Sequence, residues 1–126
     1  MKSTVISILV ASALIAGAFM FATRSPEIAT VENVYVGHGT QFIDITAKGK
    51  YLPHLTAAKA DMPTVLRMQT NGTFDCTAAL TIPAVGYRSM LPPSGVTEIE
   101  IPPQKSGTTL RGVCAMGMYN FEVQFN

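Results

Sequence analysis

The feature that most constrains the fold of this chain is a series of short runs in which apolar and polar residues alternate. In two of these runs, residues 97–101 and 121–125, every second residue is Glu or Gln. Such alternation is typical of β-strands that bury one face and expose the other. Similar runs at 42–47, 65–69 and 79–82 are separated by turn signals at 48–50, 71–72, 92–95 and 105–107. The pattern predicts an all-β domain, built as an antiparallel sandwich or barrel.

An uncharged run at residues 5–22, preceded by Lys2, predicts one hydrophobic helix before this domain. Its length lies near the lower end of the roughly 17–25 residues that span a bilayer. One interpretation is an uncleaved signal anchor, and the other is a signal peptide that is cleaved after residue 18. The apolar run continues through residues 19–21, which favours the anchor. Both interpretations place the domain outside the cytoplasm: membrane-attached on the periplasmic or extracellular face, or secreted or periplasmic after cleavage.

Composition narrows the function classes. The chain has 126 residues and a net charge of +1, and 13% of its residues are charged. This balance offers no basic surface for nucleic acid. The sequence also contains no recognisable Ser–His–Asp set, no carboxylate pair in an apolar context and no phosphate-binding glycine loop. We therefore expect a protein that is not an enzyme.

The chain is expected to have three parts. Residues 1–24 form the signal anchor or signal peptide, 25–39 form a linker with one short strand at 34–36, and 40–126 form the β-domain.

Two cysteines and two methionines form the candidate metal site. Cys114, Met116 and Met118 occupy every second position, which along a strand end would point the three side chains to one side. Gly117 allows the backbone to bend so that the sulfur atoms can converge. Cys76 follows a turn-rich stretch and lies at another junction of strand and loop. Thiolate and thioether ligands select Cu(I) over zinc, calcium or iron.

Other interpretations of these residues remain open. Two cysteines in an exported protein usually form a disulfide, and methionines at this spacing also occur in strand cores. A zinc site is poorly supported, because His38 and His54 have no partner at the usual spacing and are expected to be solvated loop residues. Met90 could guard the site or donate one more thioether.

The chain also resembles a known family over residues 40–126. Besides Cys76 and the loop from Cys114 to Tyr119, the shared positions are Tyr51, Pro53, Leu80, Ile82, Pro83, Gly86, Leu91, Pro92, residues 98–101, Pro103 and Gly107. Together they resemble the cupredoxin-like domains with a Cys-Gly-Met-Gly-Met loop, found in membrane-anchored copper chaperones of the CupA type and in N-terminal domains of copper-exporting P-type ATPases. Ala115 in place of the usual glycine, and Val113 before the cysteine, are departures that remove no sulfur donor.

The resemblance implies a cupredoxin-like Greek-key β-sandwich in which Cys76, Cys114, Met116 and Met118 bind Cu(I). It implies a protein that holds Cu(I) and passes it on by ligand exchange, with a copper-exporting P-type ATPase or another membrane copper acceptor as partner and with the N-terminal helix in the membrane. In this family Cys76 and Met116 stand where an electron-transfer cupredoxin carries its histidines. Electron transfer is one alternative function, and a disulfide-stapled β-sandwich that mediates interactions without metal is another.

Overall fold

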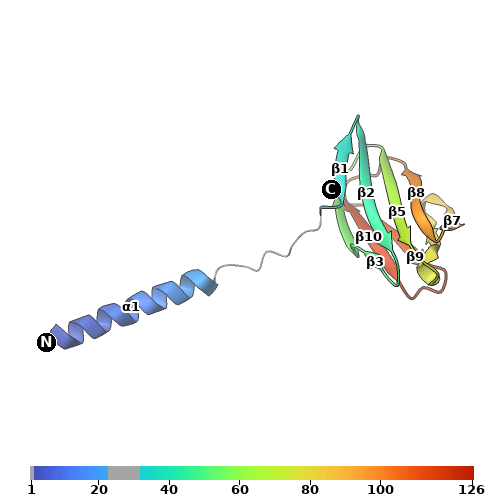
Figure 1. The fold of residues 1–126 in the computed structure, drawn as a ribbon. Coiled ribbons are helices and arrows are strands. Elements are labelled where there is room, and N and C mark those ends of the chain that lie inside the picture. Colours follow the sequence, from blue (N-terminus) through green and yellow to red (C-terminus); the bar gives the residue numbers. More distant parts are fainter. Residues whose placement is uncertain (1, 23–31) are drawn as a thin grey trace. The chain divides into compact units, whose positions relative to one another are not determined.

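The computed structural model describes residues 2–22 and 32–126, which belong to two compact units, Met1–Thr30 and Val31–Asn126 (Figure 1). In the first unit, α1 (Lys2–Ala22) is the predicted N-terminal helix. Its side chains between residues 3 and 18 are exposed within this unit. Across the two described stretches of chain, no helix combines the length and the apolar character needed to cross a membrane.

The regular structure of the second unit consists of strands and two short 3₁₀-helices, so the prediction of a mainly β protein with one N-terminal helix is confirmed. Ten strands form two five-stranded sheets (Figure 1). The first sheet has the order β1 (Val34–Gly37), β2 (Thr40–Ala47), β5 (Thr64–Asn71) and β8 (Ser94–Ile101), and β3 (Tyr51–Leu52) pairs with β2. The second sheet has the order β4 (Leu55–Ala58), β10 (Asn120–Phe125), β9 (Thr109–Cys114), β6 (Ala79–Ile82) and β7 (Tyr87–Met90). Two 3₁₀-helices, η1 (Cys76–Ala78) and η2 (Pro83–Val85), flank β6.

The expectation of an antiparallel sandwich or barrel is wrong for two strand pairs. β2 pairs with β5 in parallel, and β10 pairs with β4 in parallel, whereas the other pairs are antiparallel. The reason is the path of the chain between β2 and β5, which passes through β4 in the other sheet before it returns. Parallel neighbours require such a crossover connection. The hydrophobic pattern has the same two-residue period in parallel and in antiparallel pairs. The sequence therefore could not distinguish the two kinds of pairing.

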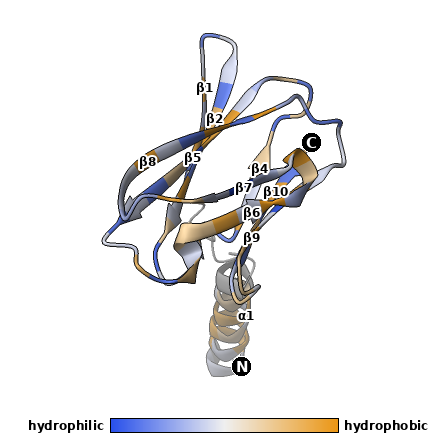
Figure 2. Cartoon of the chain, turned by 90° about the vertical axis from the view of Figure 1, so that its right-hand side faces the viewer, coloured by the Kyte–Doolittle hydropathy of each residue, from blue (hydrophilic) through white to orange (hydrophobic). Residues whose placement is uncertain are grey.

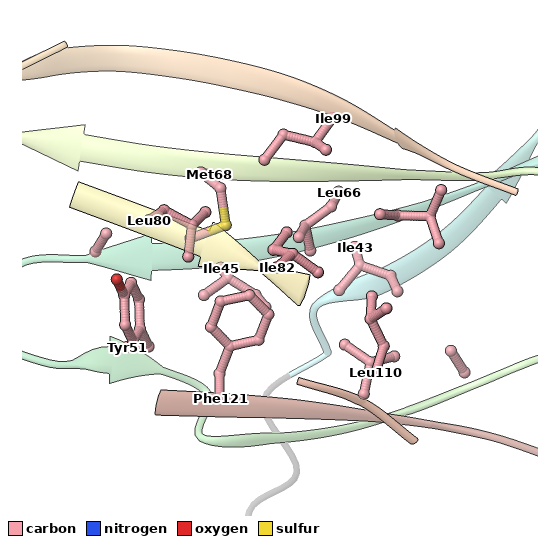
Figure 3. Packing of buried hydrophobic residues seen from close by; sticks show 14 of the residues in the cluster. Ile43, Ile45, Tyr51, Leu66, Met68, Leu80, Ile82, Ile99, Leu110 and Phe121 are labelled. Atoms are coloured by element: carbon pink, nitrogen blue, oxygen red, sulfur yellow. The ribbon is translucent and has the colours of Figure 1, made fainter. Parts of the chain in front are cut away.

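The two sheets enclose one core, to which both contribute alternate residues (Figure 3). Every second residue is buried along β2, β5 and β10, as the sequence pattern predicts. On β8, Ile99 and Ile101 are buried while Glu98 and Glu100 are exposed. Figure 2 shows the matching change between hydrophobic and hydrophilic residues along the strands.

β1 lies within the segment that the sequence interpretation assigned to a linker with one short strand. It joins β2 through a turn of two residues, His38 and Gly39, whose φ angles are 52° and 77°. Such left-handed pairs match the twist of a tight hairpin. His38 is exposed there, as expected for a loop histidine.

Candidate metal centre

The structure brings the two cysteines together. The Sγ atoms of Cys76 and Cys114 lie 2.9 Å apart although 38 positions separate them in sequence, and both cysteines are free. Cys114 is buried, with 1% of its surface exposed, whereas Cys76 is half-buried. The thiol of Cys76 donates a hydrogen bond to Cys114. The pair therefore sits where the edge of the core meets the surface.

Cys114 is held by the end of β9. It stands opposite Leu80 of β6, and like Leu80 it faces the core. The chain then turns sharply, because the amide of Gly117 donates to the Cys114 carbonyl at 2.8 Å and the amide of Cys114 donates to the Tyr119 carbonyl at 3.0 Å. Gly117 has a φ of 69°, a conformation that glycine adopts without strain. The last residue of a paired strand is a rigid position for a ligand.

Cys76 is held by Asp75, which caps the short helix η1. The carboxylate of Asp75 accepts hydrogen bonds from the amide and the hydroxyl of Thr77, and these bonds lower the pKa of Asp75. Its other oxygen accepts from the amide of Gly49 at 2.8 Å, which ties η1 to the turn between β2 and β3. The hydroxyl of Tyr51 donates to the Thr77 carbonyl at 2.9 Å from inside the core. Four hydrogen bonds, two from Thr77 and one each from Gly49 and Tyr51, thus hold the segment that places Cys76 beside Cys114.

The two thiols differ in acidity. The hydrogen bond to Cys114, together with burial, raises the pKa of the Cys76 thiol to about 11. Burial is the largest single influence on Cys114 and opposes its ionisation. The hydrogen bonds from Cys76 and from backbone amides of the following turn outweigh burial and lower the pKa of Cys114. One of these amides, from Tyr119, lies 3.4 Å from the Cys114 sulfur. Cys114 is therefore the thiol of the pair that ionises more readily.

The methionines lie in the turn that follows β9, where Met116 and Met118 are 77% and 64% exposed. The interpretation that they are core residues is therefore wrong. The expectation that an extended strand aligns Cys114, Met116 and Met118 on one side is also wrong, because β9 ends at Cys114 and a turn follows. Cys114 faces inward, and the two thioethers face solvent beyond it. The two-residue spacing of Cys114, Met116 and Met118 therefore belongs to a strand end followed by a turn, and it does not indicate an extended strand.

The other candidate residues are distributed around this centre. Met90, at the end of β7, is 70% exposed. His54 is exposed, and its Nδ1 lies 3.0 Å from the Asn120 carbonyl at the start of β10. Within residues 2–22 and 32–126, no group of three or more His, Cys, Asp and Glu side chains could hold a metal ion.

Sequence reasoning did not assign roles to Asp75 and Tyr51. A signal for Asp75 was present, because Asp before a short helix is a common N-cap and accepts from the amide two residues on. In the sequence, Tyr51 stands out only as a position shared with the family that the chain resembles. Its role depends on its buried hydroxyl, whose pKa is raised by burial and by the nearby cysteines and Asp75. Nothing in the local sequence indicates that contact.

No family model matches the chain, and no curated protein matches it. Solved structures of similar fold do exist. One is the NMR solution structure of a copper binding protein in the apo form, with a TM-score of 0.67 and 22% identity, covering 74% of this chain and 94% of that one. Another is the metal binding domain of the Cu(I) exporting P-type ATPase CopA of Streptococcus pneumoniae D39, with Cu(I). Its TM-score is 0.65 and its identity 18%, and the match covers 74% of this chain and 92% of that one. At these identities the likeness establishes the fold.

Proposed function

We propose that this protein binds Cu(I) as cargo at Cys76 and Cys114 and passes it on through Met116 and Met118. The observation that carries the proposal is the 2.9 Å contact between two free thiols beside a turn with two exposed thioethers. Soft sulfur donors without imidazole or carboxylate are the ligand set that Cu(I) prefers. The similar folds of a copper binding protein and of a Cu(I)-binding ATPase domain support the same conclusion. We also propose that the fold is a cupredoxin-like Greek-key β-sandwich and that Cys114, Met116 and Met118 form a copper-binding Cys-x-Met-x-Met motif.

Binding begins from a pair in which Cys114 is the more acidic thiol. Metal ligation requires thiolates, so entry of Cu(I) displaces the proton of Cys76 and makes affinity depend on pH. An ion between the two sulfur atoms also needs them to separate. Cys114 is fixed at the end of a paired strand, whereas Cys76 lies on a one-turn helix and is half-buried. We expect Cys76 to make most of the movement.

Release proceeds by ligand exchange at the exposed side. Met116 and Met118 offer neutral thioethers that bind Cu(I) more weakly than thiolates do. A thiolate of a partner protein can replace such a ligand while Cys76 and Cys114 still hold the ion. Copper then moves between proteins without being free in solution. The function is binding and transfer, without a catalysed reaction.

We further propose that the domain works outside the cytoplasm beside a membrane copper acceptor, such as a copper-exporting P-type ATPase. The uncharged run at residues 5–22 supports export, through a signal anchor or a cleaved signal peptide. Attachment to the membrane would raise the effective concentration of the donor beside its acceptor. Alkaline extraction of isolated membranes and sequencing of the mature N-terminus test this part. An intact N-terminus in the membrane pellet is expected for an anchor.

The thiol contact also favours a second candidate, the disulfide-stapled interaction module, because thiols in contact can be oxidised to a disulfide. Counting thiols in denatured, non-reduced protein taken from its native compartment separates the two. The copper proposal predicts two free thiols or bound copper. Zero thiols without metal would favour the second candidate.

The direct test of binding is an anaerobic competition for Cu(I) against a chromogenic chelator. Cys76→Ser and Cys114→Ser should each weaken binding strongly, whereas His38→Ala, in the turn between β1 and β2, should not change it. Unchanged affinity in either cysteine variant contradicts the proposal. Adding cupric ion to the reduced protein should give no intense blue thiolate band. Such a band would identify an electron-transfer site instead.

A further inference from the structure

The two sulfur atoms of the thiol pair lie at a distance between those of two different states. Cys76 Sγ and Cys114 Sγ are 2.9 Å apart. A disulfide bond is about 2.05 Å long, so its formation brings the sulfur atoms closer by about 0.9 Å. Metal–thiolate bonds of about 2.3 Å, the value for zinc, place two sulfur atoms roughly 3.8 Å apart at the tetrahedral angle. A bound ion therefore requires a movement of similar size in the opposite direction.

The disulfide and the copper-bound state exclude each other. Ligation of Cu(I) requires thiolates, and a disulfide contains none. The proposed place of action, outside the cytoplasm, is a compartment in which disulfides form and persist. A copper site built on two thiols in contact therefore depends on a reaction that keeps them reduced.

The frame around the pair does not depend on a disulfide. Both cysteines are free, and hydrogen bonds hold the backbone around each of them. The amide of Cys114 donates to the Tyr119 carbonyl. The segment that carries Cys76 is held through Asp75 and Tyr51. Because Cys76 lies on the short helix η1 and not in a paired strand, a small shift of this residue leaves the sheet hydrogen bonds intact.

The two cysteines differ in their access from solvent. Cys114 is 1% exposed at the end of β9, whereas Cys76 is half-buried. A thiolate from outside the protein can therefore reach the sulfur of Cys76 more readily than that of Cys114. The amide of Tyr119 lies 3.4 Å from the Cys114 sulfur, where it stabilises negative charge on that atom. Cys76 is thus the point of attack and Cys114 the leaving group, because a stabilised thiolate leaves faster.

We propose that Cys76 and Cys114 form a reversible disulfide and that a reduced thiol partner opens it by thiol–disulfide exchange at Cys76 before Cu(I) is loaded. This inference rests on the proposed copper function, and it adds the class of reaction that must precede binding. The partner is defined by its chemistry, a reduced thiol, which a small molecule or a dithiol protein can supply.

The exchange transfers two electrons from the partner to the pair. A partner thiolate attacks the sulfur of Cys76, the bond between Cys76 and Cys114 breaks, and Cys114 leaves as a thiolate with the electron pair of that bond. A second partner thiolate then attacks the partner sulfur of the mixed disulfide and releases Cys76 as a thiolate. The partner becomes a disulfide, and the two protons lost by its thiols go to the pair or, when Cu(I) binds, to solvent. The same exchange in reverse, with an oxidised partner, closes the pair.

Redox titration of the full-length, metal-free protein in mixtures of reduced and oxidised glutathione tests the proposal. As the share of oxidised glutathione rises, the count of free thiols should fall from two to zero. After removal of glutathione, the oxidised protein should show no Cu(I) binding in anaerobic competition against a chromogenic chelator, and binding should return on reduction. Two free thiols in the most oxidising mixture, or equal Cu(I) binding in both forms, overturn the inference. If the reduced form does not bind Cu(I), the proposed copper function itself fails.

Two probes distinguish the possible sources of the thiol. Reduced glutathione is a small thiol, and reduced thioredoxin is a dithiol protein. Opening of the folded disulfide by glutathione alone identifies a small thiol as sufficient, and opening by thioredoxin only identifies a dithiol protein. If neither probe opens the folded protein while both open it in urea, the proposal is overturned. Circular dichroism should be the same for the reduced and oxidised forms, and unfolding of the reduced form would identify a structural disulfide instead.

A pair of variants locates the point of attack. Cys114→Ser keeps only the thiol of Cys76, and Cys76→Ser keeps only the thiol of Cys114. With oxidised glutathione, folded Cys114→Ser should gain one glutathione, detected by mass spectrometry, whereas folded Cys76→Ser should gain none in the same time. In urea both variants should gain one, because burial no longer protects either thiol. Equal reaction of the two folded variants contradicts attack at Cys76, and the wild-type titration decides the proposal if a variant does not fold.

Discussion

Replacement of Gly112 by alanine should destabilise the domain and disturb the thiol pair together. Gly112 is the cross-strand partner of Phe121, and a Cβ at this position would lie 2.3 Å from the ring atoms Cε1 and Cζ. Nine in ten real contacts of a Cβ are longer than 3.4 Å, so the two residues must separate by about 1 Å. Overpacking of this kind costs about 1–3 kcal/mol.

The displaced ring would carry the strain toward the candidate site. Phe121 packs edge-on against Tyr51 with ring centroids 5.1 Å apart (Figure 3), and Tyr51 holds the carbonyl of Thr77 next to Cys76. Such an aromatic pair contributes about 0.5–1.5 kcal/mol beyond its buried area. We therefore expect Gly112→Ala to lower the Cu(I) affinity as well as the stability, although Gly112 is no ligand.

Urea denaturation and thermal unfolding measure the effect. A loss of 1 kcal/mol should lower the melting temperature of a domain of this size by about 4–8 °C. Gly37→Ala is the matched control, because its Cβ would meet its nearest neighbour, Phe42, at 4.0 Å; we expect a change within about 0.5 kcal/mol. In Gly112→Ala/Phe121→Leu the combined loss should be smaller than the sum of the single losses. If Gly112→Ala is as stable as Gly37→Ala, the reasoning is refuted.

Three further predictions concern the support and the acidity of the thiols. Asp75→Ala removes the cap of η1 and should cost about 0.5–2 kcal/mol in urea denaturation, with weaker Cu(I) binding, and equal stability to wild type would contradict the role of the cap. Tyr51→Phe leaves the buried Thr77 carbonyl without its donor and should cost about 1–3 kcal/mol, measured in the same way; a change close to zero would contradict the buried bond. Titration of thiolate absorbance in the metal-free protein should show Cys114 ionising below the ordinary thiol pKa and Cys76 near pH 11. Two coincident ionisations would contradict this assignment.

The strands with a clear alternation in sequence, among them β5, β8 and β10, could be predicted because one face of each is buried. Alternation along 97–101 and 121–125 specifies which residues enter the core, and the structure confirms it. Pairing partners could not be predicted in the same way, because the period of two is identical in parallel and antiparallel neighbours. The parallel pairs β2–β5 and β4–β10 follow from the path of the chain between the sheets. That path depends on the whole fold and on no local pattern.

The candidate site was predictable in its chemistry and only partly in its geometry. Four sulfur-bearing residues stand out in the sequence, and the ligand set they form stays a prediction. The contact of Cys76 with Cys114 depends on the pairing of β6 with β9 and on the cap at Asp75, which no spacing of cysteines encodes. The exposure of the methionines also differed from the strand interpretation, because the backbone turns directly after β9. The position of Met90 follows from the register of β6 and β7 alone.

X-ray absorption of the full-length chain loaded with one equivalent of Cu(I) under anaerobic conditions tests the central claim most directly. We expect only sulfur neighbours around copper, and in Cys76→Ser and Cys114→Ser we expect fewer sulfur neighbours or no retained copper. Nitrogen or oxygen neighbours in the wild-type protein, or spectra of both cysteine variants identical to it, would contradict a Cu(I) site built on this thiol pair.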